Sequence, residues 1–564
     1  MNLRHVLIAG ASAGMIVCGT AGCVKVDTDL GHDYMPLEQQ YDVYTQEWDL
    51  EDISMQPLTH MSAYSTRRFT IGSIRVPGFG TTNKGTAFAL VPVVDTMDFG
   101  TNPVIREFHF SAMRDTVNVV NDNQTDILQN VNVYSMDGLD VTLNDIYYTE
   151  ELNNSMFAGK KRITRGVPVY DGGDSLSFKF SDEFGQSYLD KFVSLADEDG
   201  VYYMDSVANY IKDFPGIYIC TDEEIGTGGR IDMFDVAMLI EDGYVAGNYA
   251  ELKFTTTYDG EKKDTSLLFL FGAVEVPESS DDMPDQYAFN VTEIKDGCTE
   301  GAAADVLYVE GGNGMKPVFS AKEIWTKIHT ELEANSHGIP DSLIALNKVS
   351  ITLPFDFPSD YKYMSAYPEI LNPCCRIKGY TDDGEAGYTY ANLTDASISD
   401  ESHGEVDRSN CQYSADISFH SQALLKNLAA DTPDSTFNNY DVWFIISATE
   451  VDESSSSSSS SDYSDYLNQL YYYNYLNQLY GGYGSYGYSG YGYGSYGSSY
   501  SNYYSMLYYS SLYSSSSSSS TSTSEELDRD RFYGATLHGP TSSGAKPKLT
   551  LTYSVPKREF SWED

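Results

Sequence analysis

The chain has 564 residues, of which 41% are hydrophobic, so it is long enough for two or three domains with buried cores. Its formal net charge is −47 at pH 7, from 35 Lys and Arg against 82 Asp and Glu. Such a charge repels phosphate backbones and anionic lipid. It therefore excludes nucleic acid as a partner and a basic patch as the means of holding a membrane.

The first 23 residues carry an export signal. A charged start precedes an apolar run at residues 6–17, and small residues 19–22 lead to Cys23. This order is typical of a secretory signal peptide, and the run is too short to span a bilayer. The last four residues, TAGC, fit a lipobox, although Thr20 stands where leucine is usual. We predict a signal peptide at residues 1–22 and lipidation of Cys23, the alternative being a secreted protein without lipid.

Residues 23–65 are an acidic tether and lead-in segment. Between residues 24 and 50 the only Lys or Arg is Lys25, whereas Asp and Glu recur throughout. We interpret this stretch as a solvated tether. The alternative is a sorting signal that directs the lipoprotein to the outer leaflet of the membrane. Two or more acyl chains on Cys23 would hold the protein firmly at a membrane.

Residues 66–275 have the pattern of an antiparallel β-sandwich. Apolar and aromatic residues alternate with polar ones through residues 104–120 and 130–134, and this period of two predicts half-buried strands. Residues 77–80 (PGFG) predict a turn. Long stretches with the period of a helix are absent.

Two short helices interrupt these strands. Ser181 is positioned to cap the first, and Asp205 or Ser206 to cap the second, which Pro215 ends. The first helix would place three aromatic residues on one face, namely Phe184, Tyr188 and Phe192.

The clearest hairpin follows these helices. Apolar and polar residues alternate through residues 252–258, Asp259-Gly260 supplies a two-residue turn, and residues 268–271 form the returning strand. The Asp-Gly pair tolerates the positive φ angles that a tight hairpin turn needs.

An acidic stretch at residues 275–285 contains two prolines, Pro277 and Pro284, and predicts a domain boundary. A second β-sandwich is predicted over residues 286–450 together with residues 527–556. Its helix would begin at a capping box formed by Ser320 and Glu323. Its predicted strands are residues 346–355, 415–419 and 442–448.

Residues 451–526 form a low-complexity insertion of Ser, Tyr and Gly. It lacks the mixed aliphatic residues of a core, so we predict that it is disordered or self-associating. Ordered sequence resumes after it and ends in the alternating stretch 547–553. We expect that final strand to pair with residues 442–448 across the insertion.

Several spaced motifs together resemble one family. They are DLGHDYMP at residues 29–36, GSIRVPGFGTT at 72–82, NVY at 132–134, FPGIYI at 214–219, LYVEGG at 307–312, ALNKVSITLP at 345–354, YGA at 533–535 and KPKLTLT at 546–552. In this order they resemble the Bacteroidota lipoprotein family catalogued as domain of unknown function 4270. The resemblance covers nearly the whole mature chain except the insertion. It implies an outer-membrane lipoprotein and no assigned catalytic residues.

Each candidate ligand site in the sequence also has a purely structural interpretation. Acidic clusters at residues 197–199, 222–224 and 382–385 suit Ca²⁺ or are solvated loops. Residues 311–314 (GGNG) suit an anion at a helix N-terminus or form a turn. Cys374-Cys375 suits a redox pair or two buried thiols. A Ser-His-Asp site assembled from distant residues is a further alternative.

We predict a mostly-β protein made of two antiparallel, jelly-roll-like β-sandwich domains with short connecting helices. No catalytic, metal or cofactor residue is predicted, and Cys23 is the one site residue. The predicted function is that of a non-catalytic binding or scaffold lipoprotein of the outer membrane, at the cell surface or the periplasmic face. Its partner would be a glycan or a protein. The alternatives are a fimbrial-type subunit or adhesin, and an enzyme acting on polysaccharide.

Overall fold

The computed structural model describes residues 40–556, except for segments 116–126, 276–284, 381–385, 394–402 and 454–520 and for gaps of at most four residues elsewhere. The described chain is mostly β, with antiparallel strand pairing and few helices, and this confirms the predicted fold class. Within the described residues, no helix has both the length and the apolar character needed to cross a membrane.

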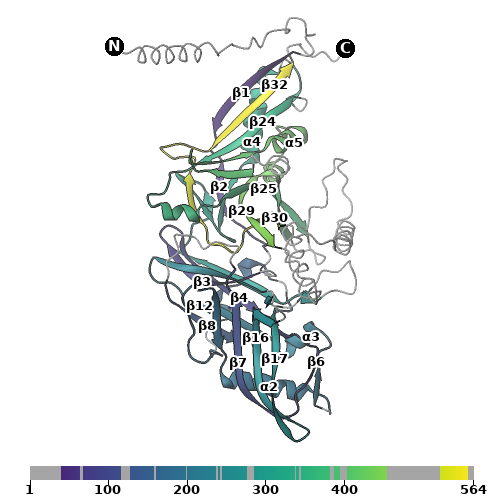
Figure 1. The fold of residues 1–564 in the computed structure, drawn as a ribbon. Coiled ribbons are helices and arrows are strands. Elements are labelled where there is room, and N and C mark those ends of the chain that lie inside the picture. The colour runs from purple at the N-terminus through teal and green to yellow at the C-terminus, as the bar shows by residue number, and fades with distance from the viewer. Residues whose placement is uncertain are drawn as a thin grey trace, which may run out of the picture.

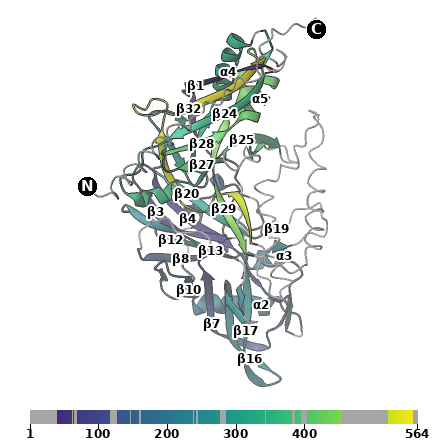
Figure 2. The same ribbon diagram turned by 45° about the horizontal axis from the view of Figure 1, so that its top comes forward.

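The described residues form two bodies that lie end to end (Figures 1 and 2). The N-terminal body is built around a core that runs from Ala63 to Val291. The C-terminal body is built around a core that includes Leu50 and residues from Leu307 to Val555. Strands β1 (Tyr41–Asp49) and β32 (Lys548–Pro556) lie at one end of the molecule (Figure 1). The hairpin of β16 (Tyr249–Tyr258) and β17 (Glu261–Phe271) lies at the other end.

The N-terminal body is a sandwich of a seven-stranded and a five-stranded sheet. The sheets pack through phenylalanine, since the ring of Phe69 lies 6.4 Å from Phe110 and 6.3 Å from Phe271 on the opposite sheet. Rings of this size bury large apolar areas and dominate a core. The seven strands are β3 (Arg68–Val76), β4 (Gly80–Phe88), β8 (Gln129–Ser135), β9 (Val169–Tyr170), β12 (Ile217–Thr221), β13 (Gly228–Asp235) and β20 (Ala288–Lys295). The five are β5 (Leu90–Pro92), β7 (Thr101–Met113), β10 (Ser175–Lys179), β16 (Tyr249–Tyr258) and β17 (Glu261–Phe271).

The hairpin and both helices predicted in this body are confirmed. Strands β16 and β17 pair from Tyr258 and Glu261, and Asp259 and Gly260 turn with φ angles of 51° and 82°. Helix α2 (Asp182–Leu195) starts at Ser181, whose side chain accepts the backbone N–H of Phe184. Helix α3 (Val207–Asp213) starts at Ser206 in the same way. Local capping and turn chemistry therefore set these elements.

The C-terminal body contains a sheet of twelve strands. They are β1 (Tyr41–Asp49), β2 (Ile53–Pro57), β21 (Gly301–Ala302), β23 (Met315–Phe319), β24 (Ala345–Pro354), β25 (Ile370–Tyr380), β26 (Ala386–Asn392), β27 (His403–Asp407), β28 (Gln412–Asp416), β29 (Val442–Glu453), β30 (Thr521–Leu527) and β32 (Lys548–Pro556). Further described pairs are β6 (Thr96–Asp98) with β11 (Val201–Tyr203), β14 (Leu239–Glu241) with β15 (Tyr244–Gly247), β18 (Val274–Glu275) with β19 (Asp285–Gln286), and β22 (Val306–Glu310) with β31 (Gly534–His538).

Helices α4 (Ala321–Asn335) and α5 (Ser418–Asn427) pack against this sheet and each other. The shorter helices are α6 (Asp434–Phe437), η3 (Thr149–Glu151), η4 (Asn154–Met156), η6 (Tyr361–Ala366) and η8 (Asn438–Tyr440). The strand predicted at residues 415–419 ends instead at Asp416, and α5 begins two residues later. The Asp416 carboxylate accepts the backbone N–H of Ser418, which turns the chain from strand to helix.

The final strand has other partners than the sequence led us to expect. β32 pairs with β1 on one side and β24 on the other, whereas β29 pairs with β25, β23 and β30. The expected pairing of residues 547–553 with residues 442–448 is therefore wrong. Alternation identifies a strand and its buried face, but it does not identify the neighbouring strand.

The two predicted domain boundaries also shift. Strand β20 lies beyond the boundary expected at residue 286, yet it pairs with β4 and belongs to the N-terminal body. Strands β1 and β2 precede the first sandwich in sequence, yet they belong to the C-terminal body. The first two strands of the described chain thus belong to the C-terminal body, the next part of the chain forms the N-terminal body, and the remainder completes the C-terminal body. The interpretation of the stretch up to residue 50 as a solvated tether is therefore wrong for residues 41–50, because β1 pairs with β32 and Leu50 is buried in the core.

Glu323 holds this incoming chain in place. Ser320 caps α4 by accepting the backbone N–H of Glu323, as predicted. The Glu323 carboxylate does not complete the capping box, because it accepts the backbone N–H groups of Glu51 and Asp52 at 2.9–3.1 Å. A charged acceptor on two N–H groups fixes the link between β1 and β2 to α4.

Candidate functional site

Cys23, the one site residue predicted from sequence, lies outside the described residues. The described chain begins at Gln40 and continues directly into β1. Among the described strands, β1 pairs only with β32, at the end of the molecule opposite the β16–β17 hairpin (Figure 1). The chain that follows Cys23 therefore joins the fold at this end.

A buried polar junction joins the two bodies, and it consists of Arg68, Lys84, Asp115, Asn290, Asp528 and Asp530. The Nε of Arg68 donates to Asp115 at 2.9 Å, and its Nη1 lies 3.4 Å from Asp530. Asn290 donates to the same Asp530 carboxylate at 3.4 Å. Arg68 and Asn290 lie on strands of the N-terminal body, whereas Asp530 follows β30 of the C-terminal body. Sequence reasoning missed this cluster.

Asp528 organises the segment that enters the junction. One carboxylate oxygen accepts the backbone N–H groups of Asp530 and Arg531, each at 3.0 Å. The other accepts the Arg531 guanidinium and the Tyr533 hydroxyl, each at 2.8 Å. Burial acts to raise the pKa of Asp528, but the Arg531 charge and these hydrogen bonds outweigh it and hold the pKa below its usual value. Asp528 is therefore an ionised structural hub.

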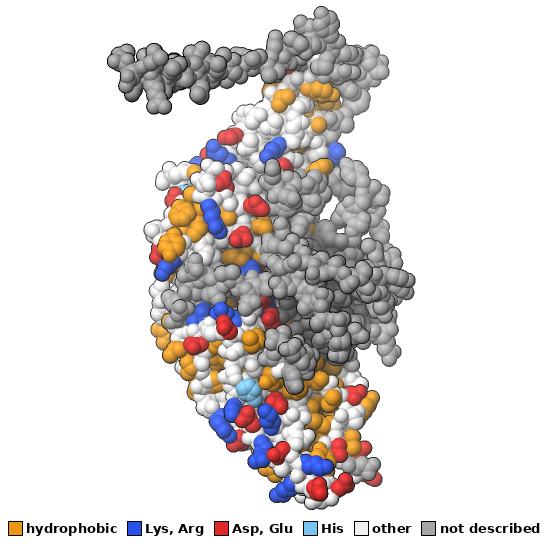
Figure 3. Space-filling view, viewed as in Figure 1, with side chains coloured by type: hydrophobic (Ala, Val, Ile, Leu, Met, Phe, Trp, Pro, Cys, Tyr) orange, Lys and Arg blue, Asp and Glu red, His pale blue; other side chains and the backbone are white. Residues whose placement is uncertain are grey.

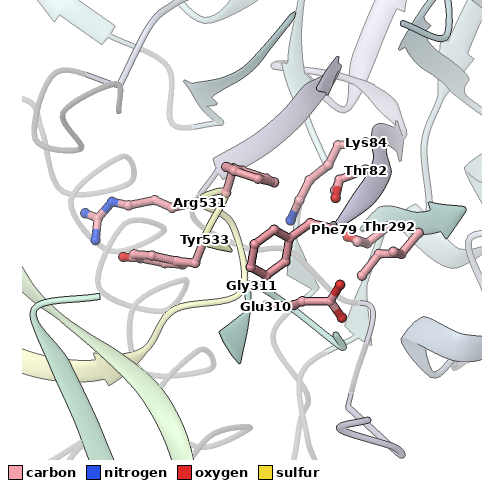
Figure 4. A pocket seen from close by; sticks show the side chains of 10 residues that line it. Phe79, Thr82, Lys84, Thr292, Glu310, Gly311, Arg531 and Tyr533 are labelled. Carbon is pink, nitrogen blue, oxygen red and sulfur yellow. The ribbon is translucent and has the colours of Figure 1, made fainter. Parts of the chain in front are cut away.

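Lys84 points into a small cavity beside the junction (Figure 4). Its ammonium donates to the backbone oxygen of Arg529 at 2.6 Å, and burial lowers its pKa. The cavity, which Thr82, Thr292 and Tyr533 also line, has a volume of about 10 Å³, enough for about one water molecule. The Arg531 side chain points away from it (Figure 4). This cavity is too small for an organic ligand.

Residues 311–314 form a turn that surrounds an ammonium group. Lys316, 1% exposed, donates from Nζ to the backbone oxygens of Gly312 at 3.1 Å and Gly314 at 3.0 Å, and also to that of Glu310. An anion site would need N–H groups facing inward, but here carbonyl oxygens do so. The prediction that residues 311–314 form a turn is confirmed, and the alternative of an anion-binding site there is wrong.

Three described residues of the acidic clusters, Asp197, Asp222 and Glu223, are bonded within the fold. Asp222 accepts from Asn130 at 2.8 Å and Asn132 at 2.7 Å, and Glu223 pairs with the exposed Lys295. Asp199 and residues 382–385 lie outside the described residues. In the part of the chain that the structure describes, no three His, Cys, Asp or Glu side chains are grouped to hold a metal ion.

The described cysteines are all free thiols: Cys220, Cys298, Cys374, Cys375 and Cys411. Cys374 and Cys375 do not form a disulfide, which agrees with the reading of two thiols. The Cys375 sulfur lies 3.8 Å from Nδ1 of His420, whose Nε2 lies 2.9 Å from the backbone oxygen of Tyr440. Burial raises the pKa of Cys375 to about 12 and lowers that of His420 to about 4. The pair therefore stays neutral and does not provide a reactive thiolate.

Burial of neutral His420 predicts a loss of stability in mild acid. Between pH 6.5 and about 4 the unfolded chain takes up a proton at this residue and the folded chain does not, so lower pH favours unfolding. We expect a loss of about 3 kcal/mol across this window. It is measured as the difference in unfolding free energy between wild type and His420→Gln, each followed by urea denaturation from pH 7 to pH 4.

The comparison of wild type with His420→Gln is needed because Asp441 changes the pH dependence of stability in the opposite direction. Burial raises the pKa of Asp441 to about 6, so its protonation stabilises the fold as pH falls toward 4. Both proteins retain Asp441, so its contribution cancels. Equal pH dependence of the two proteins would contradict the prediction.

A serine, a histidine and an aspartate do meet in the C-terminal body. Ser542 Oγ lies 2.9 Å from Nδ1 of His538, and Nε2 of His538 lies 3.2 Å from Asp356. However, Ser542 Oγ also accepts the backbone N–H of Gly544. The N–H groups of Gly539 and Thr541 are bonded to Asp305 and Ala304, so these neighbours do not form an oxyanion hole. We interpret these hydrogen bonds as a structural network that stabilises the turn after β31.

The outer face of the five-stranded sheet carries paired charges. Lys179 and Glu107 on adjacent strands lie 2.5 Å apart, and Lys253 and Glu251 lie 2.8 Å apart. The hydrogen bond from Lys179 lowers the pKa of Glu107. Figure 3 shows basic and acidic side chains interspersed around a histidine on this body. These half-exposed pairs satisfy one another and form an ordinary solvated face.

Comparisons with known proteins give no relative: no family model, no curated protein and no solved structure matches this chain.

Proposed function

We propose that the mature protein is an outer-membrane lipoprotein, anchored through acyl chains on Cys23, that acts as a non-catalytic binding or scaffold protein. The signal at residues 1–22 supports the anchor. The position of β1 supports the proposal most strongly, because the described chain begins there, at one end of an elongated molecule (Figure 1). The 16 residues 24–39 span at most about 55 Å when extended. In this arrangement the C-terminal body faces the membrane and the N-terminal body faces outward.

The polar clusters support a binding or scaffold role over an enzyme. Within the described residues, the junction, the Lys316 turn and the Cys375–His420 pair all use their hydrogen-bonding groups inside the fold. Strand β32 lies between two neighbours, so it does not present the vacant groove that a fimbrial subunit filled by a donated strand would show. These observations favour the binding role over the fimbrial alternative.

Protease treatment of intact cells tests the location. We expect external protease to digest the wild-type chain without lysis, and mass spectrometry of the first mature peptide to find acyl chains on Cys23. The Cys23→Ser variant, which retains all described residues, should leave the membrane fraction. Complete protection of the wild type would limit the protein to the periplasmic face, and an unmodified Cys23 would refute the anchor.

A further inference from the structure

Exposed aromatic side chains gather in one loop of the C-terminal body. Phe357, Tyr361 and Tyr363 lie within seven residues and are 50%, 68% and 42% exposed. Elsewhere among the described residues, the other aromatic side chains with 40% or more exposure are single and widely spaced in sequence: Tyr41, Tyr203 and Phe419. Single exposed apolar residues are normal on a protein surface, but a group of them indicates a contact site.

This aromatic loop, residues 356–363, is held rigidly by its neighbours. Asp360 accepts the backbone N–H of Lys362 at 3.1 Å and begins η6. Met364 and Ala366 are buried beneath the loop, and the Tyr367 hydroxyl lies 3.1 Å from the backbone oxygen of Thr536. The rings are therefore presented on a fixed backbone, so little backbone entropy is lost when a ligand binds.

Polar groups of both kinds surround the rings. The Asp356 side chain is 92% exposed and is oriented by His538, which lies 3.2 Å away. Asp360 and Lys362 are also exposed. The loop thus combines apolar ring faces with hydrogen-bond acceptors and a donor. A sugar ring has the complementary surface, with an apolar C–H face and a rim of hydroxyl groups.

We propose that the aromatic loop is a docking site for a neutral polysaccharide. The net charge of −47 repels anionic glycans, nucleic acid and anionic lipid, whereas a neutral chain meets no such repulsion. A cationic partner would be attracted to the whole surface, and Lys362 would oppose it at the loop. The rings would stack on sugar faces while the two carboxylates accept sugar hydroxyl protons. This inference rests on the binding role proposed above and names the class of ligand for that role.

Affinity electrophoresis of the soluble Cys23→Ser protein tests the proposal. Native gels would contain soluble starch, xyloglucan or mixed-linkage β-glucan as the probe. We expect at least one polysaccharide to retard the protein, and the double variant Tyr361→Ala/Tyr363→Ala to weaken that binding at least tenfold. Phe419→Ala and Tyr203→Ala are matched controls, because each removes an exposed aromatic residue outside the loop, and they should bind like the parent.

Three results would overturn the proposal. They are no retardation by any of the three polysaccharides, equal retardation of the double variant, and salt-sensitive binding of oligolysine that depends on Tyr361. The replaced rings are exposed, so the double variant should keep the near-ultraviolet circular dichroism of buried aromatic residues. The assay uses purified protein, so its failure leaves the result of protease treatment of cells intact.

Discussion

Replacing Asp528 with alanine is expected to lower the free energy of unfolding by about 3–5 kcal/mol, because it leaves buried partners without their counter-charge. Asp528 is 4% exposed and accepts four hydrogen bonds, including those from Arg531 and Tyr533. Loss of this hub should also separate the unfolding of the two bodies. Urea denaturation followed by circular dichroism measures the loss, and limited proteolysis measures opening of the junction.

A surface aspartate provides the matched control. Asp434 is exposed and pairs with Lys322 at 2.6 Å, so Asp434→Ala should cost less than about 1 kcal/mol.

The lowered pKa of Asp528 also predicts that acid reduces the stability of the protein. Its folded pKa lies below the unfolded value of 3.8, so its contribution is present above pH 3.8 and is lost as pH falls below it. Asp528→Asn should remove that part of the acid response. A loss below 1 kcal/mol in Asp528→Ala would show that the hub is dispensable.

Replacing Gly80 with alanine is expected to destabilise the protein by about 3 kcal/mol or more, because the new methyl group would meet backbone atoms. A Cβ at Gly80 would lie 2.1 Å from the oxygen of Lys295 and 2.5 Å from the carbonyl carbon of Asp296. Gly80 also has a φ of 73°, which an L-residue adopts at a cost of about 1–2 kcal/mol. Thermal and urea unfolding measure the effect.

Gly78 in the same turn separates the clash from the backbone strain. Its φ is 87°, but nothing lies within 4 Å of an added Cβ. Gly78→Ala should therefore cost only the strain, about 1–2 kcal/mol. Between the two glycines, Phe79 is buried, and its ring lies 5.6 Å from Tyr308 of the C-terminal body. Equal losses in the two variants would mean that the contact with Lys295 is not tight.

Local rules predicted the elements that depend on a few neighbouring residues. Ser181 and Ser206 cap their helices as expected, and Asp259-Gly260 turns the hairpin, since each needs only backbone groups within three residues. The partner of β32 could not be predicted in this way. Its alternation specifies the buried face, while β1, about 500 residues earlier, supplies the neighbouring strand.

The junction was missed for a related reason. The run Asp528-Arg529-Asp530-Arg531 reads as a solvated stretch, because charged residues are almost never buried unless they are paired. Its partners Arg68, Lys84 and Asn290 lie hundreds of residues away. The aromatic loop was missed as well. Phe357, Tyr361 and Tyr363 resemble core residues in the sequence, and their exposure is visible only in the fold.

The sequence by itself determined the mostly-β class and the positions of the hairpin and the capped helices. The tertiary structure decided which strands belong to which body, how charges are buried between the bodies and which aromatic residues face water. The physical reason is the range of the interactions. Turns, caps and alternation depend on adjacent residues, whereas strand order, charge pairing and exposure depend on segments that meet only when the chain has folded.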